Sequence, residues 1–319
     1  MSLIAPYTLL LMKLINHFYI DLIYKYSLMI KKIYKSLLLD KYIKDIFFQG
    51  SGNSIAQMIS ILILPILSRI YNPEDFGIFN IFTQFTALMG ILLTFRLEYF
   101  VLLNKSNIEI SCYLKKIFSL SLILTLFYSI IFLLFHQKIT FFSEDITATS
   151  YFILCPLAGL AFSFSILFQQ LVQREEDFKT SGLSEIINKM FYGITALMGF
   201  FYKSVIFLLM STVLGPLSKA IFLLKKSNSE IVRNSFSNSI VGKIKKEIVK
   251  NSISFSTSSL IQFFIGILPI LYITKNFSIT TLGHFSLVIS CLYLPTSLLG
   301  NALGQVYFQR SSSLYHEKK

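Results

Sequence analysis

The sequence predicts an all-α protein, a polytopic transmembrane bundle of about eight helices, and three observations lead to this prediction. Hydrophobic residues make up 54% of the 319-residue chain, and charged residues make up only 14%, whereas soluble proteins carry about 25%. Several charge-free stretches reach about 20 residues, the length that a helix needs to cross a bilayer. Because a chain in lipid must satisfy its own backbone hydrogen bonds, apolar segments of this length are predicted to be helical.

Charge-free windows place the predicted spans. In chain order they are 46–68, 76–95, 117–135, a span within 146–173, 183–201, 204–224, a span within 251–274, and 281–305. They form a first bundle of six helices at 46–224 and the first two helices of a second bundle at 251–309. A basic cytoplasmic linker at 225–250 separates the bundles, and 310–319 is a cytoplasmic tail. Residues 1–45 are basic and amphipathic, so we expect them at the inner membrane surface.

Lys and Arg gather on one side of the predicted spans. With a cytoplasmic N-terminus, all but four of the 29 Lys and Arg residues lie in inside segments, and the exceptions are Arg69, Lys138, Lys203 and Lys275. An extra span within 3–23 would invert this orientation and place most of the positive charge outside. The net charge of +13 therefore indicates topology first and contact with anionic lipid headgroups second. We predict a multi-pass membrane protein with a cytoplasmic N-terminus.

The pentapeptide ILPIL occurs at 63–67 and again at 267–271, and each copy is followed by Gly-x-Phe. Pro65 thus corresponds to Pro269, and Gly77 corresponds to Gly283. Six predicted spans separate the copies, so both enter the membrane from the same side, as in transporters built from parallel repeats. Each proline removes a backbone hydrogen bond, which predicts bends at matching depth. A coincidence within a low-complexity alphabet is the alternative.

Two segments carry family motifs. In Gly52–Leu103 the motifs are Gly-Asn followed by Ala-Gln, Pro-x-x-x-Arg, Asn-Pro-Glu-Asp-Phe-Gly and Arg-Leu-Glu. In 282–312 they are Pro295 and the run from Gly300 to Val306. Both segments resemble the polysaccharide (O-antigen type) flippases of the multidrug/oligosaccharidyl-lipid/polysaccharide exporter superfamily. Together they cover about a quarter of the chain.

The resemblance implies that a polyprenyl-pyrophosphate-linked oligosaccharide is moved from the inner to the outer leaflet by rocking of two bundles. It also implies membrane lipids, a polysaccharide polymerase and chain-length machinery as partners, and no nucleic acid. Such flippases have two equal bundles, so we expect a C-terminally truncated copy or half of a split gene. Neither the cysteines nor the histidines show metal-ligand spacing, and no cofactor or metal is predicted.

Five polar residues are predicted to line a cavity for phosphate and sugar: Arg96, Glu98, Asn53, Gln57 and Gln305. A guanidinium bonds two phosphate oxygens at once, which makes Arg96 the first candidate. At a spacing of two, Arg96 and Glu98 are predicted to face different sides of a helix. Snorkelling of Arg96 is its alternative, and helix bridging is the alternative for the amides.

Further residues have weaker or different predicted roles. A gate or turn role is predicted for Pro65, Arg69, Pro73, Gly77, Pro269 and Gly283. Additional cavity candidates are Gln84, Gln169, Gln170 and Arg310. Glu185 and Lys189, four residues apart, are interpreted as an ordinary helix pair near the inner surface.

Other functions have weaker sequence support. No phosphate-binding loop is present, so nucleotide hydrolysis is not predicted. A membrane glycosyltransferase, polymerase or ligase needs a sizeable outside loop with catalytic residues, and the predicted outside loops are short. A drug or peptidoglycan-precursor exporter of the same superfamily and a non-functional remnant stay open as alternatives.

Overall fold

The computed structural model describes residues 41–103, 106–135, 151–202, 204–227, 231–232, 246–292, 304 and 307, and all regular elements in these segments are helical. Six of the helices are long and apolar enough to cross a membrane: 47–70, 73–94, 107–134, 151–174, 206–226 and 250–276. A shorter apolar helix occupies Ile279–Leu292. The prediction of an all-α transmembrane bundle is confirmed.

The chain divides into two compact units, Met1–Phe47 and Phe48–Lys319. Of the first unit, the structure describes only the start of α2 (Lys41–Ile70). The predicted surface segment at 1–45 therefore lies largely outside the described residues. All contacts below belong to the second unit.

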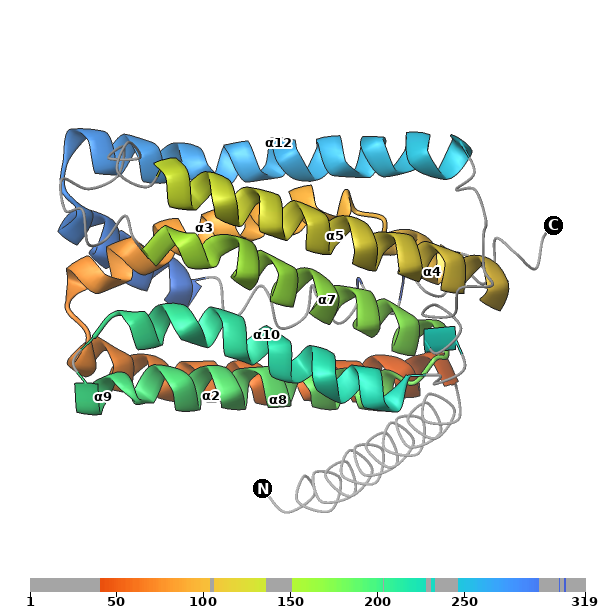
Figure 1. Cartoon of the computed structure of the whole chain (residues 1–319). Coiled ribbons are helices and arrows are strands. Elements are labelled where there is room, and N and C mark those ends of the chain that lie inside the picture. Colours follow the sequence, from red (N-terminus) through yellow and green to blue (C-terminus); the bar gives the residue numbers. More distant parts are fainter. Residues whose placement is uncertain are drawn as a thin grey trace, which may run out of the picture. The chain divides into compact units, whose positions relative to one another are not determined.

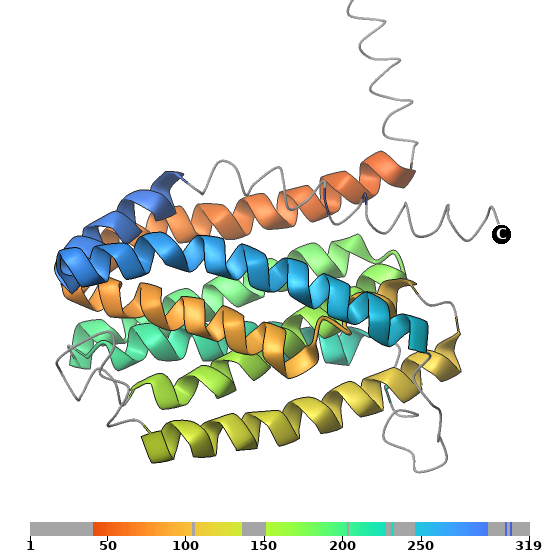
Figure 2. The ribbon, with the colours of Figure 1, turned by 90° about the horizontal axis from the view of Figure 1, so that it is seen from above.

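The remaining helices follow in chain order (Figure 1). They are α3 (Pro73–Thr94), α4 (Tyr99–Leu103), α5 (Asn107–Phe135), the 3₁₀ turn η2 (Tyr151–Leu154), α7 (Cys155–Arg174), α8 (Phe178–Leu197), α9 (Gly199–Tyr202), α10 (Ile206–Lys226) and α12 (Lys246–Asn276). Helices α7, α8 and α10 pack on one another, and α3 packs on α7. Figure 2 shows α12 running beside α3.

The hairpin between α2 and α3 is defined by its sequence. Pro73 occupies the first turn of α3, where a missing N–H costs nothing, and Glu74 with Asp75 places negative charge at the helix N-terminus. The backbone N–H of Asn72 donates to the Asp75 carboxylate at 2.9 Å. The Tyr71 hydroxyl donates to the Ala196 carbonyl at 2.7 Å and ties the hairpin to the end of α8.

The corresponding hairpin after α12 repeats this local design. Ser278 takes the place of Asn72, and its hydroxyl accepts a hydrogen bond from the Thr281 N–H at 3.1 Å. Thr281 itself takes the place of Asp75, 206 residues earlier. The repeat therefore extends from the ILPIL segments into the caps of the helices that follow them.

Glycines permit a close crossing of α2 and α8 in the first bundle. A Cβ on Gly182 of α8 would lie 2.7 Å from the Phe48 carbonyl of α2, and a Cβ on Gly52 would overlap the Gly182 backbone. Without a strong hydrophobic drive between helices in lipid, such close backbone approach is a main source of packing energy. The Gly-Asn motif at 52–53 therefore has a packing function at its glycine.

The fifth predicted span, 183–201, overlaps α8, but α8 begins earlier, at Phe178, and ends at Leu197. It begins earlier because Asp177 caps it: the Asp177 carboxylate accepts the Thr180 N–H at 3.0 Å. Lys189 on α8 and Lys219 on α10 lie inside these helices, and their assignment to inside loops was wrong.

Gly52→Val is expected to lower the free energy of unfolding by about 1–3 kcal/mol, because the added side chain overpacks the α2–α8 crossing. Thermal unfolding in detergent measures this change. Gly266→Val on α12 is the matched control, since the nearest atom to its Cβ is the Gln84 Oε1 atom at 4.0 Å. Equal destabilisation by both substitutions would contradict the crossing.

Candidate functional site

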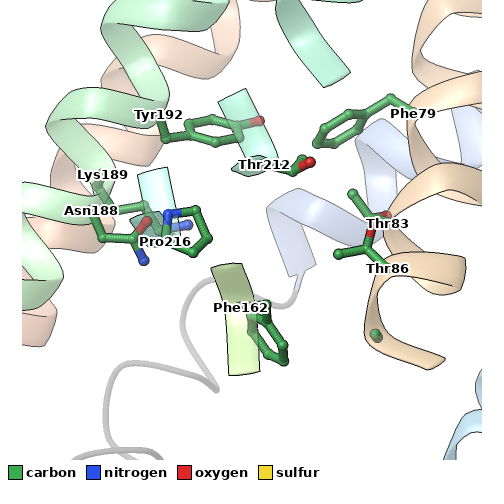
Figure 3. Close-up of a pocket in the computed structure, with 10 residues that line it drawn as sticks. Phe79, Thr83, Thr86, Phe162, Asn188, Lys189, Tyr192, Thr212 and Pro216 are labelled. Atoms are coloured by element: carbon green, nitrogen blue, oxygen red, sulfur yellow. The ribbon is translucent and has the colours of Figure 1, made fainter. Parts of the chain in front are cut away.

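A cavity of about 370 Å³ lies inside the first bundle, between α3, α7, α8 and α10. Its wall consists of Phe79, Thr83, Thr86, Ala87, Phe162, Asn188, Lys189, Tyr192, Thr212 and Pro216. In Figure 3 the α8 side chains face Thr83 and Thr86 of α3, and Phe162 of α7 lies at one end of the space between them. The volume falls in the range of ligand sites, about 300–1,000 Å³.

The cavity wall contains polar groups as well as apolar ones. Asn188 contributes an amide, and Thr83 and Thr212 contribute hydroxyls. The buried Oγ1 atom of Thr86 has no hydrogen-bond partner among the described residues. Pro216 cannot donate to the Thr212 carbonyl one turn earlier, which leaves that backbone oxygen without its helical partner. The cavity therefore presents both donors and acceptors.

Lys189 gives the cavity its positive charge. Its ammonium lies 5.4 Å from the centroid of the Tyr192 ring, a cation–π arrangement. Within the described segments it has neither a hydrogen bond nor an ion pair. An ionisable side chain inside a membrane bundle is costly, and it commonly marks a substrate or ion pathway.

A second lysine lies in the same bundle but is fully neutralised. Lys219 of α10 is 4% exposed, and its Nζ atom donates to Glu185 Oε1 at 2.7 Å and to Gln169 Oε1 at 2.9 Å. Gln169 in turn donates to the Ser181 hydroxyl at 3.2 Å and to Glu185 Oε1 at 3.1 Å. Gln173 donates to Ser181 at 3.0 Å. The network ties α7, α8 and α10 together.

The charges of Glu185 and Lys189 do not cancel each other. Glu185 and Lys189 lie one turn apart on α8, but the carboxylate is occupied by Lys219 of α10. The interpretation of Glu185 and Lys189 as an ordinary helix pair near the inner surface was wrong, because the ion-pair partner of Glu185 comes from another helix. The Lys219–Glu185 pair is neutral, so Lys189 leaves one uncompensated positive charge beside the cavity.

Arg96 and Glu98 lie together in the turn that follows α3. Their Nη1 and Oε1 atoms are 3.4 Å apart, so the prediction that they face different sides was wrong. The physical reason is that α3 ends at Thr94, and Phe95 and Arg96 adopt left-handed backbone conformations with φ of 48° and 56°. A turn brings residues two apart onto one side, whereas a helix separates them.

The environment of this turn is buried and crowded. Arg96 Nε donates to the Ser259 hydroxyl of α12 at 3.0 Å, and its guanidinium lies 5.7 Å from the Tyr99 ring centroid. Glu98 is 1% exposed, and its Oε2 atom has no hydrogen-bond partner among the described residues. Burial raises the pKa of Glu98 above its ordinary value, although the neighbouring Arg96 charge acts to lower it.

The other predicted residues that the structure describes lie away from the cavity wall. Asn53 is buried and accepts a hydrogen bond from the Gln49 amide at 3.2 Å within α2, and Gln57 is partly exposed. Gln305 and Arg310 lie outside the described residues. Pro65, Arg69 and Pro269 are exposed near the ends of α2 and α12. Gly77 and Gly283 are buried at the two hairpins, where they contact the opposite copy.

Sequence reasoning missed the cavity wall and Lys219. Lys219 stands in a sequence window that reads as the apolar end of a span beside a basic linker, and nothing local indicates burial. One signal was present: Glu185, Lys189 and Asn188 lie within a single apolar window, and charges inside such a window need partners on other helices.

The chain matches a known protein family over most of its length. Residues 66–319 match the family model described as "Polysaccharide biosynthesis protein". The chain belongs to this family. Membership confirms the resemblance to polysaccharide flippases that the motifs in Gly52–Leu103 and 282–312 indicated. No curated protein matches the chain.

Two solved structures are similar to this chain at low sequence identity. One is described as "Reverse polarity of binding pocket suggests different function of a MOP superfamily transporter from Pyrococcus furiosus Vc1 (DSM3638)"; it is 11% identical, with a TM-score of 0.48 over 88% of this chain and 70% of that chain. The other, named "protein A", is 12% identical, with a TM-score of 0.49 over 87% of this chain and 66% of that chain.

Lys219→Met is expected to lower the free energy of unfolding by about 3–5 kcal/mol, because it leaves the Glu185 carboxylate unpaired inside the bundle. The double variant Glu185→Gln/Lys219→Gln removes both charges and is expected to lose less than the single variant. Unfolding titrations in detergent compare them, with Lys179→Met, an exposed residue of α8, as control. A single variant as stable as the wild type would contradict the network.

Proposed function

We propose that this protein moves polyprenyl-pyrophosphate-linked oligosaccharide repeat units across the bacterial inner membrane for surface polysaccharide biosynthesis. The observation that carries the proposal is a polar cavity with one uncompensated ammonium inside the apolar bundle of a polysaccharide biosynthesis protein. The protein acts in this proposal as a transporter that works by alternating access and makes or breaks no covalent bond.

The chemistry of the cavity suits the proposed headgroup. Pyrophosphate carries negative charge, and Lys189 offers an ammonium with three donors and no competing anion within ion-pair distance in the described residues. Asn188, Thr83 and Thr212 offer the mixture of donors and acceptors that sugar hydroxyls need. The adjoining Tyr192 ring provides an apolar face beside the charge.

The apolar surface suits the polyprenol tail. Large hydrophobic side chains are exposed along α2 and α12, including Met58, Leu62, Phe264 and Leu268. A tail in lipid can lie against such a surface while the headgroup occupies the bundle interior, since the tail needs no polar partner. The proposed substrate is therefore matched at both ends.

The distribution of basic residues supports a cytoplasmic N-terminus and linker. The end of the bundle that holds the α3–α4 turn and the end of α10 carries Arg96, Lys115, Lys116, Arg174, Lys179, Lys225, Lys226 and Lys250. The hairpin end carries Arg69 and Lys275 among the described residues. By the positive-inside rule, the hairpin end faces the outside.

The residues predicted from the sequence keep a place in this proposal. Arg96 and Glu98 lie at the cytoplasmic end of α3, where a headgroup would first be captured. Asn53, Gln57 and Gln305 are proposed as further contacts, with membrane lipids, a polymerase and chain-length machinery as partners. The N-terminal segment 1–45 is proposed to lie on the inner leaflet. We further propose that 46–224 is the first bundle, that 225–250 is the linker, that 251–309 is the start of the second bundle, and that 310–319 is the tail.

Lys189→Gln is expected to reduce surface polysaccharide about tenfold or more in a strain that lacks its own polysaccharide flippase, because a charge-assisted phosphate contact contributes about 1.5–3 kcal/mol. Surface polysaccharide is measured at matched protein levels. Lys189→Arg is expected to restore much of the export, and Lys179→Gln on the same helix is the control. Export by Lys189→Gln at the wild-type level would contradict the proposed site.

Arg96→Ala is expected to reduce export in the same strain, because it removes the guanidinium from Glu98 and Ser259 at the proposed capture point. A double variant, Arg96→Ala/Glu98→Ala, separates headgroup binding from charge balance. If it exports as the wild type does, Arg96 serves only to neutralise Glu98. Normal export by Arg96→Ala alone would remove Arg96 from the site.

A further inference from the structure

The two hairpins of the repeat touch each other through their glycines. A Cβ on Gly77 would overlap the Ile279 carbonyl, and a Cβ on Gly283 would overlap the Pro73 carbonyl. Gly283 is the repeat counterpart of Gly77, and Ile279 is the counterpart of Pro73, each 206 residues later. The first copy thus makes the same contact with the second that the second makes with the first.

A hydrogen bond lies at the centre of this reciprocal contact. The Asn80 amide donates to the Ser286 hydroxyl at 2.5 Å, and these two residues are themselves 206 positions apart. Counterpart residues can touch each other directly only near a twofold axis, as at the centre of an isologous dimer interface. Asn80 and Ser286 therefore lie at a local twofold axis that relates the two hairpins.

This contact closes one end of the bundle near the cavity. Phe79, which lines the cavity, and Tyr192 have ring centroids 6.5 Å apart. Leu287, next to Ser286, packs on the same hydrophobic cluster as these two rings. The layer formed by these side chains lies between the cavity and the hairpin end.

The contact is also suited to come apart. Each helix completes its own cap without the partner, through Asn72 with Asp75 and through Ser278 with Thr281. The first turns of two helices approach each other, and the positive ends of their dipoles repel. Among the described residues, one hydrogen bond, two glycine contacts and the apolar packing of Leu282 and Leu287 hold the copies together here, and separation leaves no cap broken.

We propose that the reciprocal hairpin contact is the closed gate at the hairpin end of the transport pathway, with Asn80–Ser286 as its latch. The proposal rests on the proposed transport function and adds the residues that open and close one side of it. It explains why both repeat copies carry glycine at the same position: any larger residue there keeps the two helices from meeting.

Cross-linking tests the gate directly. In a background without Cys112, Cys155 and Cys291, the pair Asn80→Cys/Ser286→Cys is expected to form a disulfide in membranes, detected by mass spectrometry of the linked peptides. The bridge is expected to lower polysaccharide export at least tenfold, and reduction is expected to restore it. Failure of the bridge to form, or normal export by the bridged protein, would overturn the gate.

A matched pair controls for cross-linking as such. Ser111 donates to the Ile231 carbonyl at 3.0 Å, a contact that does not involve the hairpins. The pair Ser111→Cys/Ile231→Cys is therefore expected to leave export unchanged when bridged. Equal loss of export with both bridges would show that any cross-link stops the protein, and the gate would lose its support.

A labelling measurement separates the gate from the proposed cargo. Thr83→Cys lines the cavity, and Gly283→Leu is expected to increase its labelling by an impermeant maleimide from the hairpin side about threefold or more. Gly266→Leu is the control, since the nearest atom to a Cβ at Gly266 is the Gln84 Oε1 atom at 4.0 Å, an ordinary van der Waals contact. Raised labelling without any saccharide export would keep the gate and reject the cargo, whereas unchanged labelling would reject the gate.

Discussion

A buried ammonium inside an apolar bundle is costly unless an anion pairs with it, and Glu185 pairs with Lys219 at 2.7 Å. Much of the first bundle depends on this interaction. It joins α8 to α10, and Gln169 of α7 completes it by accepting from Lys219 and donating to Glu185. Removing either charge would leave the other unpaired where water is scarce. The free-energy cost of an unpaired buried charge exceeds the net stabilisation that the intact pair provides. The three helices therefore have one mutual arrangement, and the cavity takes its wall from it.

The same pairing sets the charge of the cavity. Glu185 lies one turn from Lys189 on α8, but its carboxylate pairs with Lys219 of α10. Because Lys219 occupies the carboxylate, Lys189 remains as a positive charge beside hydroxyl and amide groups. The Lys219–Glu185 ion pair thus leaves the Lys189 ammonium available for an anionic ligand. At the hairpin end, Gly77 and Gly283 bring the second repeat copy against the first. Helix α3 therefore contributes both to the cavity wall and to the contact between the two hairpins.

The spans were predictable because hydropathy is a local property, and six helices agree with the charge-free windows. The hairpins were predictable for the same reason, since the cap at Asn72–Asp75 and the ILPIL repeat are contiguous in sequence. The start of α8 was not predictable from hydropathy, because polar residues of its first turns face other helices. Arg96 and Glu98 were placed on opposite sides because the left-handed turn after Thr94 has no glycine to indicate it. Lys219 needs a partner 34 residues away, and no local pattern contains that information.

We propose that Lys189 holds the anionic headgroup of a lipid-linked saccharide inside the first bundle. A cryo-electron microscopy map of the protein in nanodiscs with a polyprenyl-pyrophosphate oligosaccharide tests it most directly. Phosphate density is expected within hydrogen-bonding distance of Lys189 Nζ, about 3 Å, and this density is expected to be lost in Lys189→Gln. Phosphate density that lies elsewhere in the wild type, or persists in the variant, would contradict it.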